Sequence, residues 1–148
     1  MKKSILFFSL FLLLGSGLSF GQTLYRTSVG ELSFFSKTPA LDIEALNKKA
    51  GAILNAGTRD LAIQMKITDF QFPNKLMQEH FNEYYVESEK FPKASFKGTY
   101  NEGTVTGALT IHGVTKEISV PATLIEENEN FVLTTAFDII LAEYNVEI

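Results

Sequence analysis

Residues 107–124 read GALTIHGVTKEISVPATL, and this stretch decides the fold class. Apolar and polar residues alternate on both sides of His112-Gly113, which is the period of a half-buried β-strand. A glycine beside the histidine supplies the positive φ angle that a tight hairpin turn needs. The stretch therefore predicts two antiparallel strands joined at His112-Gly113. Proline cannot donate to a strand ladder, so Pro121 predicts an edge position, a bulge or a bend.

The same alternation continues through most of the chain. It predicts further strands over residues 24–29, 31–36, 43–55, 61–67, 93–100 and 131–141, separated by short turns rich in Asn and Gly. One segment differs: residues 74–90, between Pro73 and Pro92, carry an apolar stripe of helical period, with Asn74 as N-cap. We therefore predict an all-β, antiparallel barrel of about eight strands with one helix inserted between strands.

The N-terminus reads as a targeting segment. Lys2 and Lys3 precede an apolar run over residues 5–14, and small residues follow at Ser19 and Gly21. This order is typical of a secretory signal peptide, and the run is shorter than the roughly 20 residues of a spanning helix. We predict a signal peptide over 1–21, a single domain over 22–148, and a periplasmic or secreted location. The chain has no cysteine, so packing alone must stabilise the domain.

Several functional classes are not expected. The chain has a net charge of −4 and shows no basic stripe in its sequence, which argues against nucleic acid as a partner. His80 and Glu83 could share a helix face, but neither a further ligand nor an HExxH pattern accompanies them. His112 could act with Thr115 or Ser119 and Glu117, yet no nucleophile elbow is present. We expect no catalysis, no metal and no cofactor.

Two stretches carry a resemblance to a known family. Residues 90–97, KFPKASFK, and 105–116, VTGALTIHGVTK, resemble the YceI-like family of exported lipid-binding domains. Residues 77–81, MQEHF, are similar to the inter-strand helix of that family. The resemblance implies a lipocalin-like barrel whose apolar tunnel holds a polyisoprenoid or similar long apolar chain, without catalysis. Family members continue into a further closing strand, so we expect the C-terminal closing strand to be missing here. Such an open edge would allow a homodimer to form.

An eight-stranded barrel is either just filled by its own side chains or holds one ligand. In the first case the protein would be an envelope structural or interaction protein that acts through its surface or an open edge strand. In the second it is a lipid carrier or reservoir whose tunnel is lined by inward-facing apolar residues. The residues expected to line this tunnel are Phe34, Ile63, Met65, Ile67, Phe72, Met77, Phe81, Phe96, Leu109, Ile111, Ile118, Val120, Phe137 and Ile139.

Overall fold

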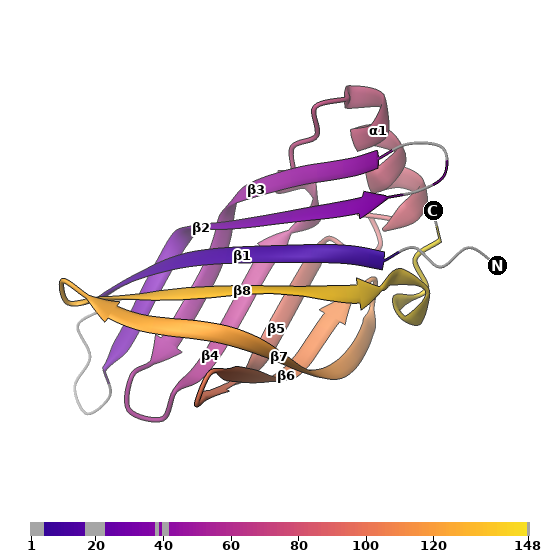
Figure 1. Ribbon diagram of the computed structural model, residues 1–148. Helices are drawn as coiled ribbons and strands as arrows, with labels where there is room; N and C mark the ends of the chain where they lie inside the picture. The colour runs from indigo at the N-terminus through magenta and orange to yellow at the C-terminus, as the bar shows by residue number, and fades with distance from the viewer. Residues whose placement is uncertain (1–4, 17–22, 38, 40–41, 148) are drawn as a thin grey trace.

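The computed structural model describes residues 5–16, 23–37, 39 and 42–147. Eight antiparallel strands follow one another around a closed barrel, which confirms the predicted fold class (Figure 1). The strands are β1 (Ile5–Ser16), β2 (Leu24–Lys37), β3 (Asp42–Asn55), β4 (Asp60–Lys66), β5 (Lys93–Asn101), β6 (Thr104–Ile111), β7 (Val114–Glu127) and β8 (Asn130–Ile140). Short helical elements are η1 (Ile67–Asp69), α1 (Lys75–His80), η2 (Phe81–Tyr85) and η3 (Leu141–Tyr144).

The expectation that the barrel lacks its closing strand is wrong. β1 lies between β2 and β8 and pairs with both, from Ile5↔Ile140 to Leu14↔Phe131 along β8 (Figure 1). The apolar run that reads as a signal peptide therefore forms a wall strand in the full chain. Its alternate side chains Phe8, Leu10, Leu12 and Leu14 are buried in the core. A dimer through an open edge has no free strand to use in the described barrel.

The strands predicted over 24–29 and 31–36 are one strand, β2. Its ladder with β3 shifts register on both sides of Gly30, where the strand is irregular. A Cβ atom at Gly30 would lie only 2.1 Å from Leu12 Cδ2, so the missing side chain lets β1 pack closely against β2. Gly30, the residue between the two predicted strands, thus marks an irregular point within a continuous strand.

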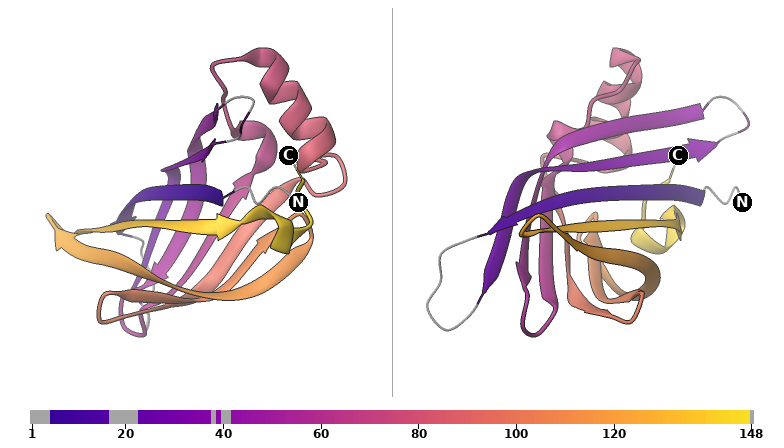
Figure 2. Two further views of the ribbon diagram at one scale, coloured as in Figure 1. Left: turned by 45° about the vertical axis from the view of Figure 1, so that its right-hand side comes forward. Right: turned by 60° about the vertical axis from the view of Figure 1, so that its left-hand side comes forward.

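A helical segment covers one end of the barrel (Figure 2). The predicted N-cap is confirmed, because Asn74 Oδ1 accepts a hydrogen bond from Met77 N–H at 3.1 Å. The helix is shorter than predicted: α1 continues into the π-helical η2, and Glu87 then has φ of +48°, outside the helical region. Phe81 of η2 stacks on Phe34 of β2 at 5.1 Å between ring centroids. None of the helices in the described ranges combines the length and apolarity needed to cross a bilayer.

β7 changes its partner at Pro121, the proline that predicted an edge, a bulge or a bend. Residues 114–121 of β7 pair with β6, whereas residues 122–127 pair with β8. The β7–β8 ladder ends at Ala122↔Thr135, and beyond it the two strands diverge (Figure 1). We call the region between residues 114–121 of β7 and 136–140 of β8 the β7–β8 seam. Along this region no ladder joins the two strands.

Candidate apolar ligand site

The barrel interior encloses a small apolar cavity of about 50 Å³. Its lining residues are Phe8, Leu10, Leu32, Ile63, Met65, Ala94, Phe96, Val105, Leu109, Ile111, Ile118, Val120, Leu133, Thr135 and Phe137. Thr135 is the polar member of this set, and its hydroxyl donates to the backbone carbonyl of Pro121 at 2.6 Å. That hydrogen bond satisfies the hydroxyl, so the lining presents apolar surface to anything in the cavity.

The structure divides the predicted tunnel residues between two places. Ile63, Met65, Phe96, Leu109, Ile111, Ile118, Val120 and Phe137 line the cavity. Phe34, Phe72 and Phe81 instead belong to an aromatic cluster with Phe70 beneath the helical segment. Ile67 and Ile139 are buried elsewhere in the core, and Met77 packs against it from α1. The sequence predicted one continuous tunnel, whereas the structure shows a cavity beside an aromatic cluster.

Phe8 joins these two regions. Its ring stacks on Phe137 at the cavity, with 5.8 Å between centroids, and lies 6.3 Å from Phe34 in the aromatic cluster. The ring of Phe8, from β1, therefore contacts both the cavity lining and the aromatic cluster.

Seven lining residues were missed by the sequence analysis. Phe8 and Leu10 were assigned to the signal peptide, and Leu32, Ala94, Val105, Leu133 and Thr135 were not selected. A signal was present for five of them, because each lies at even spacing from a predicted residue on its own strand: Leu32, Ala94, Val105, Leu133 and Thr135. Residues at even spacing on one strand share a face of the sheet.

The cavity wall is least buried at the β7–β8 seam. Ile118 and Val120 on β7 and Phe137 on β8 are only partly buried. On the opposite wall, by contrast, Ile63 and Phe96 are 4% and 6% exposed. The half-buried lining residues therefore lie where no ladder joins β7 to β8.

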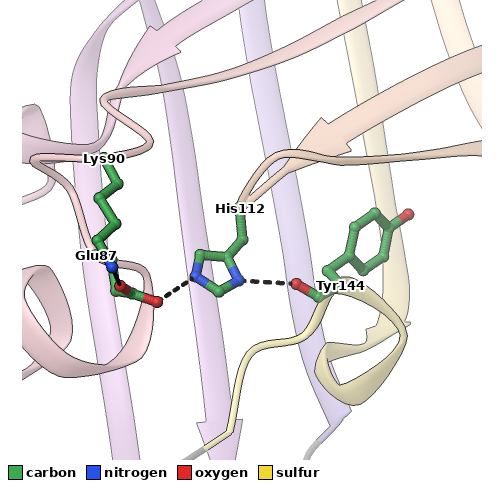
Figure 3. A network of polar contacts seen from close by, with 4 residues as sticks. All are labelled: Glu87, Lys90, His112 and Tyr144. Carbon is green, nitrogen blue, oxygen red and sulfur yellow. Dashed lines mark hydrogen bonds and ion pairs between the residues drawn. The ribbon is translucent and has the colours of Figure 1, made fainter.

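His112 lies at the centre of a polar network near the covered end (Figure 3). Its Nδ1 lies 3.1 Å from the carbonyl oxygen of Tyr144, and its Nε2 lies 3.0 Å from Glu87 Oε1. A carbonyl and a carboxylate only accept, so the ring nitrogen donates in each of these hydrogen bonds. Lys90 Nζ lies 2.9 Å from Glu87 Oε2. Hydrogen bonds from Lys90 and then from His112 hold the pKa of Glu87 below its usual value.

This network joins three separate segments: the β6–β7 turn, the loop after η2, and η3. Phe91 packs its ring edge-on against His112 at 4.6 Å, and a Cβ on Gly113 would lie 2.6 Å from that ring. Both turn residues have positive φ, 53° and 73°, as the predicted tight hairpin requires. The two stretches that carry the family resemblance therefore meet at this corner.

The catalytic set considered for His112 is not assembled. The ring contacts Glu87 and Tyr144, whereas Thr115 shares a hydrogen bond of 2.7 Å with Thr110 across the hairpin. The ring of His80 lies against Tyr84 at 5.5 Å. Within the described ranges, no three His, Asp or Glu side chains come together as metal ligands could. The hydrogen bonds of His112 connect the β6–β7 turn with the loop after η2 and with η3.

Comparison with known proteins gives a consistent result. The YceI-like domain family matches residues 16–148 of the chain. Three solved structures are similar in fold. A polyisoprenoid-binding domain from Saccharophagus degradans has a TM-score of 0.64 at 11% identity, covering 95% of this chain and 81% of that one. Burkholderia cenocepacia BcnA has a TM-score of 0.54 at 17% identity, covering 95% and 82%.

The third is the Campylobacter jejuni YceI protein, with a TM-score of 0.57 at 19% identity, covering 68% of this chain and 69% of that one. No curated protein is similar enough in sequence to match. At these identities the structural likeness supports the fold, whereas the family match extends over most of the sequence. The chain therefore belongs to the YceI-like domain family.

Proposed function

We propose that the protein holds a long apolar chain of the polyisoprenoid class inside its barrel, as a carrier or reservoir without catalysis. The observation that carries this proposal is the apolar cavity, whose one polar side chain is already hydrogen-bonded within the wall. A cavity of that character offers nothing to a polar metabolite but favours hydrocarbon. The similar fold of a domain described as polyisoprenoid-binding supports the same class of ligand.

The cavity must widen for such a ligand. It encloses about 50 Å³, whereas ligand pockets commonly enclose about 300–1,000 Å³. The partly buried Ile118, Val120 and Phe137 line it at the β7–β8 seam, where no strand ladder has to break. Met65, on the opposite wall, has a flexible side chain that adapts to irregular space. We infer that the ligand enters through the seam and displaces these side chains.

Binding of this kind depends on length more than on head-group chemistry. Each buried methylene contributes about 0.8 kcal/mol, so a tail of several isoprene units gains affinity through burial alone. Part of that gain is offset by ordering the ligand and by moving the seam side chains. We therefore expect affinity to rise with the number of isoprene units until the interior is full.

Mass spectrometry of the protein recovered from its native cells tests the proposal. An organic extract should contain a prenyl species in near-stoichiometric amount, and the intact mass shows whether residues 1–21 are still attached. Loss of that segment supports export to the periplasm or beyond, which the sequence of residues 2–21 favours. An extract without lipid, together with no rise in melting temperature when isoprenoid quinones are added, would refute the proposed ligand.

A matched pair of variants on β7 tests the position of the site. Ile118→Asp places a charge in the cavity wall, so uptake of a fluorescent isoprenoid should fall at least tenfold. Ser119→Asp is the control, because Ser119 is exposed on the outer face, where it shares a 3.1 Å hydrogen bond with Thr106. Both variants are first checked for a cooperative thermal transition. Equal uptake by the two variants would place the ligand outside the barrel.

A further inference from the structure

The outer face of the sheet over β2 to β5 is hollowed by a groove of about 1180 Å³. Five cationic side chains contribute to its lining: Arg26, Lys49, Lys66, Lys93 and Lys97. Asp69 is the only acidic residue among the lining residues. The chain as a whole has 13 basic and 17 acidic residues. A cationic face on an acidic protein is therefore a local feature of this wall, and we call it the basic groove.

Most charges of the basic groove have no ionic partner within the described part of the chain. Lys49 lies 4.0 Å from Asp69, whereas Arg26, Lys66, Lys93 and Lys97 form no ion pair there. Lys66 and Lys93 are direct partners in the β4–β5 ladder, so two like charges face each other on exposed neighbouring strands. Like charges in that position destabilise a sheet. Folding alone gives no reason for this arrangement.

A buried side chain fixes the backbone at one end of the groove. Asn47 is fully buried, and its Oδ1 accepts from Lys49 N–H at 2.8 Å while its Nδ2 donates to the Lys66 carbonyl at 3.2 Å. The β3–β4 ladder ends at Gly51↔Gln64, so the bond from Asn47 to the Lys66 carbonyl connects β3 and β4 beyond the ladder, while the bond from Lys49 lies within β3. The core therefore sets the relative positions of the backbones that carry Lys49 and Lys66.

The groove also presents apolar surface. Val29 is 67% exposed and Ile53 is 41% exposed, and both line it beside the cations. Phe96 is the aromatic residue among its lining, and that ring is 6% exposed because it faces the interior. Single-stranded nucleic acids bind by stacking on exposed aromatic rings, which the groove lacks. Cations beside exposed aliphatic side chains instead match anionic head groups above a hydrocarbon layer.

We propose that the basic groove docks the protein on an anionic lipid bilayer. The cations contact the negatively charged head groups, and Val29 and Ile53 lie against the region beneath them. This surface lies on the outside of the wall opposite the β7–β8 seam. The inference goes beyond the proposed function and does not depend on it, because the groove would bind a bilayer whether or not the barrel holds a ligand.

Co-sedimentation of the full chain with vesicles free of isoprenoids tests the inference. Vesicles of phosphatidylglycerol and phosphatidylcholine should bind the protein at low ionic strength, and pure phosphatidylcholine vesicles should not. Binding should fall as salt is raised toward 1 M, where charges are screened beyond about 3 Å. Equal binding to both vesicle types, or none to the anionic ones, would overturn the proposal. Loss of binding in millimolar inorganic phosphate at constant ionic strength would also overturn it, in favour of a site for the free anion.

Charge-matched variants separate the groove from net charge. Each lysine near an anionic surface contributes roughly fivefold to partitioning, so Lys93→Glu/Lys97→Glu should lower the partition coefficient at least about thirtyfold. The control is Lys75→Glu/Lys116→Glu, which makes the same change in net charge at exposed residues outside the groove. Thermal unfolding verifies that both variants fold. An equal loss in the control would show that net charge, and not the basic groove, drives binding.

Discussion

Two strands of the barrel wall, β1 and β4, differ in the polarity of their inner and outer faces. In β1 both faces are apolar: Leu12 is fully buried, and its neighbour Leu13 is 48% exposed. In β4 the faces differ, with Met65 buried inside and Lys66 exposed outside. The alternation of polarity reveals which side of a strand faces water. Where this alternation is absent, as in β1, the same residues fit either a signal peptide or a strand of the barrel wall. Only pairing with adjacent strands distinguishes the two.

The family match also separates β1 from β4. It begins at residue 16, so it includes β4 and β5 but excludes almost all of β1. The wall of β4 and β5 thus lies within the matched region, whereas almost all of β1 lies outside it. If export removes the residues before Gln22, the edges of β2 and β8 lose the strand that pairs with them. The role of β1 is therefore the first point to test.

The largest effect is expected from truncating an inward side chain of β1. Leu12→Ala in the full chain should lower the free energy of unfolding by about 2–5 kcal/mol, because Leu12 is completely buried among core residues. Leu13→Ala should cost less than about 1 kcal/mol, because half of that side chain already contacts water. Urea unfolding of both variants measures the difference. Equal small effects would show that β1 is not part of the folded wall.

A smaller effect is expected from a disulfide that fixes β1 to β8. Ser9 and Ala136 are direct partners in that ladder, and the chain has no other cysteine to compete. Oxidised Ser9→Cys/Ala136→Cys should gain about 2–4 kcal/mol over its reduced form. Isoprenoid uptake should stay within about twofold, because the proposed entrance is the seam on the other side of β8. If oxidation abolished uptake and reduction restored it, the ligand would enter by displacing β1 instead.

Most of the fold could be predicted because it depends on local patterns. The period of two located the strands from β2 onward, and His112-Gly113 located the hairpin that the structure confirms. Pairing between distant segments was not predictable in this way: nothing near residue 5 indicates that it pairs with Ile140. The closure of the barrel follows from the unpaired edges of β2 and β8, which exist only once the other strands are in place.

The candidate site was predicted in part for the same reason. Inward parity selected Ile63, Leu109 and Phe137 correctly as neighbours of one interior space. It could not show that Phe8 lies between that space and the Phe34 cluster, because residue 8 was assigned to the signal peptide. The basic groove was invisible in the sequence, since its cations lie between residues 26 and 97 and meet only across four strands. Sequence spacing shows which residues share one face of a strand. It does not show which residues from different strands lie together on the sheet.

The smallest effect on stability is expected at the wall that contains β4. A substitution there should change the stability of the fold and the affinity for anionic vesicles in opposite directions. Lys66→Glu replaces a repulsive pair with an attractive one, because Lys93 lies directly opposite, and should stabilise the fold by about 0.2–1 kcal/mol. The same change should weaken binding to anionic vesicles, because it removes a cation from the basic groove and adds an anion. Lys116→Glu is the control for unfolding in urea, since its partner Leu109 is apolar. A protein that gains stability while losing a binding surface would show that the like charges are kept for binding. Loss of stability in Lys66→Glu would mean that the lysine supports the fold. The walls of β1 and β4 would then differ only in how their side chains pack, and not in a binding role.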